Sequence, residues 1–237
     1  MKTTLLKTIG LIGGTSWPST IEFYKILNQM AGEKYGAGHS ARILLSSIDY
    51  FEISKHYPNN WEMINPILKR ELEYLDSVNP SCIALCNNTL HEGIDMIKSD
   101  LSLKPPFIHM VDEVVSYLSQ RKFNSVLLTG TKYTMECGYY KNKLESSGLK
   151  VVIPESAHRN LIQDIQKIIA SGVSVNSSHL TKIRQMLETY KNCDVVLAAC
   201  TELPLVINDQ SSPIEVADPA EILCQKLFQY NDGGLSK

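Results

Sequence analysis

Two segments each place a cysteine at the end of a short apolar run, followed by residues that bind carboxylates or carry protons. The first is LCNNTLHEG at 85–93, with the candidate residues Cys86, Asn87, Asn88, Thr89 and His91. The second is AACTELPL at 198–205, with the candidate residues Cys200, Thr201 and Glu202. A thiol is a suitable proton carrier because its ordinary pKa, about 8.5, lies close to neutral pH. The two segments are therefore candidates for proton-transfer chemistry.

Cys200 is the sharper of these candidates. It follows the apolar run Val195–Ala199, and Thr201 and Glu202 begin the turn or helix beyond it. The positive potential of a helix start would favour the thiolate. Cysteine is also among the most buried residue types and is often inert in protein cores. The position at a strand end, followed by hydrogen-bonding residues, favours a chemical role over a core role.

A glycine turn, Gly13-Gly14-Thr15-Ser16, lies between an apolar run and a helical pattern. The full GxGxxG and GxxxxGK[ST] patterns are absent, so nucleotide binding is not predicted. Backbone N–H groups at a helix start still suit a carboxylate, and the Thr15 hydroxyl adds a donor. The alternative is that Ser16 only caps the helix that follows.

Other polar residues near these segments have equally plausible structural roles. His91 could orient a substrate or a thiol, but a lone histidine early in a helix is more often structural. Asp49 and Glu52 could face the site or lie in a solvated loop. The remaining histidines show no ligand spacing, so no metal is predicted; they are His39, His56, His109, His158 and His179.

The composition is that of an ordinary soluble globular protein of 237 residues, 43% apolar and 20% charged. A net charge of −2 gives no reason to expect nucleic acid or an anionic membrane as partner. Six cysteines without CxxC spacing argue against zinc and suit free thiols in a reducing cytosol. The apolar start of the chain is broken by Thr8 and Gly10, so we expect a first strand rather than a signal peptide. No apolar run is long enough to span a membrane, and we expect a cytoplasmic protein.

Short apolar runs alternate with amphipathic stretches along the chain. The near-continuous runs predict strands covered on both faces, at Thr8–Ile12, Cys82–Leu85, Ser125–Leu128 and Val195–Ala199. Apolar residues spaced by three and four predict helices at Ser19–Met30, Trp61–Leu75, Asp112–Leu118 and Glu215–Tyr230. This alternation predicts an α/β fold with mostly parallel sheets.

The chain also has the layout of an internal duplication. Thr15, in a Gly-Thr turn, precedes Cys86 by 71 positions, and Thr131, in a second such turn, precedes Cys200 by 69. We expect two similar parallel-sheet α/β lobes, the first from 1–112 plus 208–237 and the second from 113–207. Ligands of such sheets bind at the carboxyl ends of the strands, which predicts an active site in the cleft between the lobes. The alternative is that any two α/β halves share such a layout.

Five blocks, in order, resemble the aspartate/glutamate racemases, close to the aspartate racemase branch, from Lys7 to Leu227. They are IGLIGGTSWPSTIEFYKILN, NNTLH, FIHMVD, LLTGTKYTMECGYYKNKL and LAACTELPLVI. The resemblance implies a homodimer that needs no cofactor, with two similar lobes and the active site between them. In such racemases a cysteine from each lobe flanks the α-carbon; one removes the proton and the other delivers one to the opposite face. Cys200 is the implied second-lobe thiol.

The first-lobe motif departs from the family pattern Cys-Asn-Thr-x-His. Aligning Asn88, Thr89 and His91 with that pattern puts Asn87, not Cys86, in the cysteine position. An amide has no useful acid or base form at neutral pH. Neighbouring strand residues point to opposite faces, so Cys86 could replace Asn87 only through a bulge. Some members of the family carry threonine there and remain active.

A second departure concerns the substrate. Acidic-substrate members use basic residues to hold the side-chain carboxylate, yet Ser46–Asp49 and Gly172–Val175 contain no Lys or Arg. A second carboxylate left unpaired there would cost several kcal/mol, so we expect a substrate other than aspartate.

The leading hypothesis is an amino-acid racemase or epimerase that moves the α-proton through Cys200, with Asn87 or a displaced Cys86 on the other face. The α-carboxylate would be bound by Thr15, Asn88, Thr89 and Thr201. Glu202 would hold the ammonium group or orient Cys200. One alternative is a one-thiol decarboxylase or isomerase of a small carboxylic acid. Another is a protein that binds amino acids without catalysis.

Overall fold

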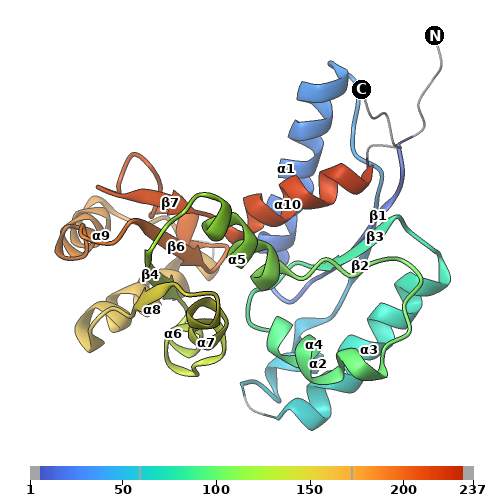
Figure 1. Ribbon diagram of the computed structural model, residues 1–237, viewed down its shortest axis with the longest axis horizontal. Coiled ribbons are helices and arrows are strands. Elements are labelled where there is room, and N and C mark those ends of the chain that lie inside the picture. Colours follow the sequence, from blue (N-terminus) through green and yellow to red (C-terminus); the bar gives the residue numbers. More distant parts are fainter. Residues whose placement is uncertain (1–5, 59, 172, 232–237) are drawn as a thin grey trace. The chain divides into compact units, whose positions relative to one another are not determined.

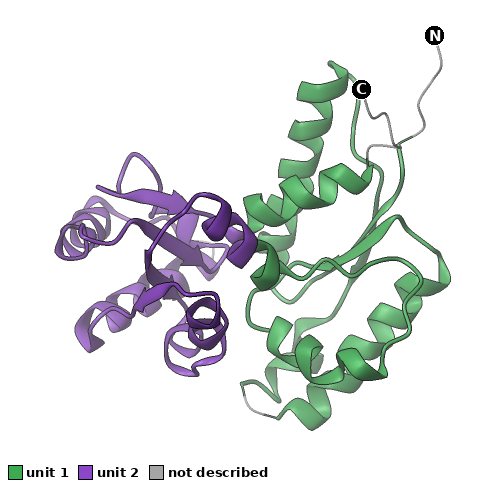
Figure 2. Cartoon of the chain, in the orientation of Figure 1, with its two compact units in different colours: residues 1–113, 220–237 green, residues 114–219 purple. Residues whose placement is uncertain are grey.

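The computed structural model describes residues 6–58, 60–171 and 173–231; Gly172, in one of the ranges discussed above, lies outside them. The chain divides into two compact units, Met1–Glu113 with Ala220–Lys237, and Val114–Pro219 (Figure 2). Each unit holds one parallel sheet with helices against it, as the strand–helix alternation predicted (Figure 1). Within the described residues, no helix is long and apolar enough to cross a membrane.

Unit 1 is built on a three-stranded parallel sheet. β1 (Ile9–Gly13) lies between β2 (Ile43–Ser47) and β3 (Cys82–Leu85). β1 and β3 are buried along their whole length, which explains why both read as near-continuous apolar runs.

Helices cover both faces of the unit 1 sheet (Figure 1). One face packs against α1 (Trp17–Tyr35) and α10 (Pro219–Asn231). The other packs against α3 (Trp61–Ser77) and α4 (His91–Ile97), with the short helices α2 (Tyr50–Ser54) and η1 (Lys98–Asp100) nearby in sequence. In β3, Cys82 and Ala84 belong to the α1 side, whereas Ile83 and Leu85 belong to the α3 side. The side-chain direction therefore alternates up to the strand end.

Unit 2 is built on a four-stranded parallel sheet in which β4 (Ser125–Gly130) lies between β5 (Lys150–Val152) and β6 (Val195–Ala199). β7 (Glu215–Ala217) extends this sheet beyond β6. One face packs against α8 (Ser156–Ala170) and α9 (Ser177–Thr189). The remaining elements are α5 (Met110–Gln120), which leads from unit 1 into unit 2, α6 (Lys132–Glu136), α7 (Tyr139–Ser146) and η2 (Leu203–Leu205).

The two sheets have the same strand order. In each, the first strand of the unit is central, and the second and third strands flank it. β1, β2 and β3 thus correspond to β4, β5 and β6, which supports the internal duplication suggested by the spacing of the Gly-Thr turns.

The division of the chain differs from the predicted one at the second boundary. Residues 208–219, expected in the first lobe, lie in unit 2, because Glu215–Ala217 pairs with β6. The last helix accordingly begins at Pro219 rather than Glu215. Proline suits the first turn of a helix because the N–H it lacks would have no partner there.

Candidate active site

The glycine turn after β1 is held in a conformation that only glycine tolerates. Gly14 has φ +87°, and a Cβ there would lie 2.1 Å from the Ile48 carbonyl oxygen. The Gly14 N–H donates to Thr20 Oγ1 over 3.0 Å, and the Thr20 hydroxyl donates to the Ser16 carbonyl over 3.1 Å. Ser16 occupies the N-cap position of α1, but its side chain makes no cap hydrogen bond, so capping does not explain this residue.

The turn brings together two residues that the sequence predicted for the site. Thr15 is buried, and its Oγ1 accepts a hydrogen bond of 3.2 Å from Asn87 Nδ2. The Asn87 side-chain oxygen accepts from the Leu90 N–H over 2.9 Å. The Asn87 amide is therefore fixed at both ends. Because the Thr15 oxygen accepts from Asn87, its own hydroxyl proton is directed elsewhere and can be donated.

His91 is a structural residue within unit 1. Its ring is fully buried, and Nδ1 lies 2.6 Å from the Asn87 carbonyl oxygen. The Met110 N–H donates to Nε2 over 3.1 Å. A backbone N–H can only donate, so Nε2 is the acceptor and the ring proton resides on Nδ1, where it is donated to Asn87. Through its two ring nitrogens, His91 therefore links the Asn87 backbone to the first turn of α5, and in this way it positions Asn87.

Cys86 lies in the core of unit 1. It is fully buried in the apolar cluster that also holds Phe23, Leu27 and Cys224. Its N–H donates to the Ile12 carbonyl over 2.8 Å, so the ladder between β1 and β3 continues regularly to this residue. Burial raises the pKa of the Cys86 thiol far above its ordinary value. The backbone shift that would turn Cys86 toward the position of Asn87 is not seen.

Asn87 occupies the position in unit 1 that Cys200 occupies in unit 2. β1 and β4 both end in glycine, at Gly13 and Gly130. Continuing the register from Ile12↔Leu85 sets Gly13 opposite Cys86, so Asn87 follows one position later. In unit 2, Gly130 pairs with Ala199, so Cys200 follows one position later.

Side-chain direction leads to the same pairing of Asn87 with Cys200. Cys200 shares a cluster with Val196 and Ala198 on the α8–α9 face, which is covered by the helices between the second and third strands of unit 2. Alternation from Ile83 and Leu85 places Asn87 on the α3 face, which is covered by the helix between the second and third strands of unit 1.

The second Gly-Thr turn, after β4, is also tightly closed. Thr131 is the N-cap of α6, and its hydroxyl accepts from the Thr134 N–H over 3.2 Å. A Cβ at Gly130 would meet the Thr134 side chain at 3.0 Å and the Ala199 carbonyl oxygen at 3.1 Å. Thr20 and Thr134 support equivalent turns, and neither was predicted. Each of them follows a Gly-Thr pair by a few residues, and this spacing is the sequence feature that could have identified them.

Cys200 forms a direct pair with Glu202. The Cys200 thiol donates to Glu202 Oε2 over 2.9 Å, and the Thr201 hydroxyl donates to the same oxygen over 3.2 Å. Cys200 is 8% exposed and Glu202 is 6% exposed, so solvent screens the pair little. The three predicted residues of this segment are thus joined in one hydrogen-bonded group at the end of β6.

The electrostatic effect on Cys200 is opposite to the predicted one. Burial raises the pKa of the Cys200 thiol well above its ordinary value, and the negative charge of Glu202 raises it further. Backbone N–H groups of Glu202 and Thr201 lower this pKa, as the helix-start argument predicted, but their effect is smaller. Cys200 is therefore a protonated thiol at neutral pH.

The remaining predicted residues have mixed placements. Asn88 is buried and Thr89 is half-buried in the turn before α4. Asp49 caps α2 by accepting from the Phe51 N–H over 3.0 Å, and Glu52 forms an ion pair with Arg70 at 3.1 Å. These contacts account for both acidic residues without the site. Within the described residues, no three His, Cys, Asp or Glu side chains are grouped as metal ligands would be.

The Cys200–Glu202 pair leads to a first prediction. In Glu202→Gln the negative charge is lost, so the pKa of Cys200 falls and thiolate forms at lower pH. Peptide-resolved mass spectrometry of iodoacetamide labelling should show the pH profile of Cys200 moving to lower pH. Cys137, an exposed cysteine outside any disulfide in the same unit, is the internal control and should keep its profile. An unchanged Cys200 profile would show that Glu202 does not govern this thiol.

Comparison with known proteins identifies the family of the chain. A family model described as Asp/Glu/Hydantoin racemase matches residues 12–227. The broad specificity amino-acid racemase RacX of Bacillus subtilis (strain 168) is 25% identical over 230 residues, which cover 92% of this chain and 95% of that protein. The protein therefore belongs to the Asp/Glu/Hydantoin racemase family, as the five sequence blocks indicated.

Solved structures agree over nearly the whole chain. An aspartate racemase homologue from Pyrococcus horikoshii OT3 is 30% identical with a TM-score of 0.82, covering 94% of this chain and 98% of that one. The aspartate racemase of Picrophilus torridus is 26% identical with a TM-score of 0.76, covering 94% and 93% of the two chains. The fold of two parallel-sheet α/β lobes is thereby confirmed as that of this family.

Proposed function

We propose that the protein is an amino-acid racemase or epimerase in which the Cys200 thiol moves the α-proton. The observation that carries this proposal is the buried Cys200–Glu202 pair at the end of β6 in a member of a racemase family. The relatives named as amino-acid and aspartate racemases support the same reaction class. The chemistry requires only side chains and substrate, in keeping with the cofactor-independent mechanism that the sequence resemblance implies.

The pair can act as a base even though the resting thiol is protonated. Glu202 Oε2 takes the thiol proton along the 2.9 Å hydrogen bond, and the resulting thiolate removes the α-hydrogen of the substrate. Returning that proton from sulfur to the α-carbon reverses the second step, and Glu202 then returns its proton to the Cys200 thiolate. Positioned proton transfer of this kind contributes about 10²–10⁴-fold to a rate.

Hydroxyl donors would stabilise the charge that develops on the substrate. Removal of the α-proton moves negative charge onto the α-carboxylate, so donors aimed at that group lower the barrier. Thr15 suits this role because Asn87 directs its hydroxyl proton away from the amide. We propose that Thr15 and the Asn88–Thr89 turn act on the same substrate as Cys200.

Asn87, as the counterpart of Cys200, makes the two faces of the reaction unequal. Both ends of its amide are hydrogen-bonded, and an amide carries no transferable proton at neutral pH. In this proposal one face of the α-carbon has the thiol, and inversion takes its proton from water on the other face. This asymmetry also favours a second candidate function, a one-thiol decarboxylase or isomerase of a small carboxylic acid.

Solvent deuterium exchange distinguishes these reactions. Each enantiomer of a panel of amino acids is incubated in D₂O, and α-deuteration and inversion are followed by NMR and chiral chromatography. We expect α-deuteration of at least one amino acid. For one enantiomer we expect α-deuteration to be faster than inversion, because only one face has a titratable group. Equal rates of exchange and inversion for both enantiomers would contradict a one-thiol site.

The alternatives are distinguished by two further assays. Release of carbon dioxide from malonate-like acids, without amino-acid exchange, would replace the racemase proposal with the decarboxylase. Binding of an amino acid by calorimetry, without exchange or turnover, would identify a protein that binds without catalysis.

A further inference from the structure

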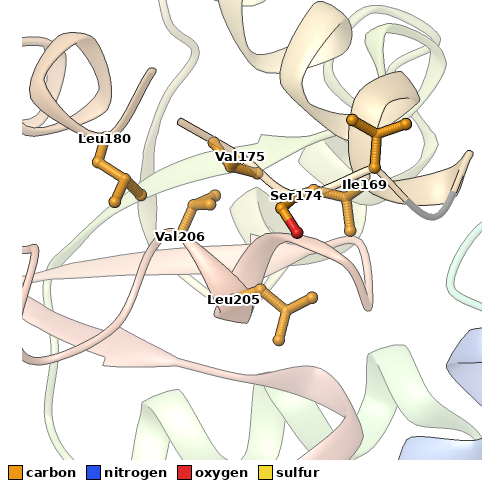
Figure 3. Close-up of a pocket in the computed structure, with 7 residues that line it drawn as sticks. Ile169, Ser174, Val175, Leu180, Leu205 and Val206 are labelled. Carbon is orange, nitrogen blue, oxygen red and sulfur yellow. The ribbon is translucent and has the colours of Figure 1, made fainter. Parts of the chain in front are cut away.

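An open apolar pocket of about 390 Å³ lies within unit 2 (Figure 3). It is formed by the end of α8, residues 173–175, α9 and the chain around η2. Its lining consists of isoleucine, valine and leucine side chains plus Ser174, and none of the described lining residues carries a charge. Figure 3 shows these side chains arriving from separate stretches of the chain to surround one space. Its volume falls within the range of about 300–1,000 Å³ that is usual for small-molecule sites.

Several lining side chains are exposed to an extent unusual for large apolar residues. Val173 is 59% exposed, Leu180 is 42% exposed and Leu205 is 63% exposed. Single exposed apolar residues need no explanation, but three that meet at one hollow indicate a surface that an apolar ligand covers. Covering them removes apolar area from water, which is the main source of affinity for such a ligand.

The pocket wall includes Leu205 and Val206, which closely follow Cys200 and Glu202 in the chain. The Leu205 N–H donates to the Glu202 backbone carbonyl over 3.3 Å. Leu205, in the pocket wall, is therefore one short turn along the chain from Glu202, whose carboxyl group accepts from the Cys200 thiol. Val206 belongs to the same apolar cluster as Cys200, and Ile169 and Val175 pack against that cluster. A ligand in the pocket would therefore lie beside the elements that carry the proton-transferring group.

We propose that this pocket receives the side chain of the substrate, and that this side chain is aliphatic, as in leucine, isoleucine or methionine. The inference rests on the proposed function and specifies its substrate class. An aspartate or glutamate carboxylate placed there would lose its hydration without meeting a cation, which is unfavourable. The uncharged lining extends the sequence observation that Gly172–Val175 contains no Lys or Arg.

The test introduces a cation at the pocket without disturbing the core. Val173→Lys and Leu205→Lys change exposed side chains, and such surface substitutions usually alter stability little. Met63→Lys, at a 50% exposed position of α3 in unit 1, is the matched control. Deuterium exchange is measured for leucine, methionine, aspartate and glutamate with the wild type and each variant.

The wild type should exchange leucine or methionine with a kcat/KM at least about tenfold above that for aspartate, a ratio within reach of a single pocket. Each pocket variant should lower the leucine value by about tenfold or more and shift the preference toward aspartate, whereas Met63→Lys should change neither. A wild type that prefers aspartate, with leucine exchange unaffected by both pocket variants, would overturn the pocket assignment and leave the racemase proposal standing.

Failure of all four amino acids to exchange would count against the proposed function, and the pocket is then tested by binding. Saturation-transfer NMR with leucine should detect contact with the wild type and its loss in Leu205→Lys. Equal leucine signals for wild type, Leu205→Lys and Met63→Lys, or no signal at all, would overturn the pocket assignment independently of catalysis.

Discussion

Replacing Cys200 with alanine is expected to slow α-proton exchange by about 10²–10⁴-fold, the usual contribution of a positioned proton carrier. The physical reason is that Cys200 is the titratable group at the end of β6 and forms a direct hydrogen bond of 2.9 Å with Glu202. Alanine leaves the Glu202 carboxyl in place but without the sulfur that reaches the α-hydrogen. The measurement is the rate of α-deuteration of the best substrate in D₂O, with circular dichroism to verify folding.

Two further variants separate chemistry from packing. Cys200→Ser keeps a donor for Glu202, but a hydroxyl is a much weaker acid than a thiol, so exchange should remain close to the alanine rate. Cys137→Ala removes an exposed thiol from the same unit and should exchange like the wild type.

Cys86→Ala tests the competing assignment, because Cys86 lies in the core cluster and should not be needed for exchange. Loss of exchange in a well-folded Cys86→Ala protein, with activity kept in Cys200→Ala, would invert the assignment.

The strands buried on both faces could be predicted from the sequence, whereas β2, β5 and β7 could not. β1, β3, β4 and β6 are buried on both faces, so their residues form near-continuous apolar runs. β2 lies at an edge, contains two serines and exposes 43% of Leu45, so its pattern is mixed. β5 and β7 have three residues each, too few to show any period. The misplaced boundary after residue 207 follows directly from the missed β7.

The positions of the candidate residues at strand ends could be predicted from the sequence, but their electrostatics could not. Strand alternation predicted that Cys86 and Asn87 could not both face one side, and the register now pairs Asn87 with Cys200. The sequence also showed Glu202 two positions beyond Cys200. It did not show that the Glu202 side chain turns back onto the thiol. Burial of the thiol, together with the nearby Glu202 carboxyl group, outweighs the backbone N–H groups at the turn, so the pKa of Cys200 is raised rather than lowered.

Replacing Gly14 with alanine is expected to destabilise unit 1 by about 2–5 kcal/mol. About 1–2 kcal/mol comes from forcing alanine into a left-handed backbone conformation, since φ is +87°. The remainder comes from crowding, because the new Cβ would lie 2.1 Å from the Ile48 oxygen and 2.6 Å from its nitrogen. Crowding of a well-packed site costs about 1–3 kcal/mol, and here the neighbours are backbone atoms that cannot rotate away.

Gly38→Ala is the matched control for this prediction. Gly38 has φ +93°, but a Cβ there would meet nothing within 4 Å, so only the conformational cost of about 1–2 kcal/mol applies. Both tryptophans, Trp17 and Trp61, lie in unit 1, so the urea dependence of tryptophan fluorescence reports the unfolding of this unit. The Gly14 variant should also lose α-proton exchange, because the shift needed to relieve the crowding moves the adjacent Thr15 hydroxyl. Equal urea midpoints for the two alanine variants would mean that the turn can shift to accept a Cβ at Gly14. A turn that shifts so readily could not hold Thr15 in place for catalysis.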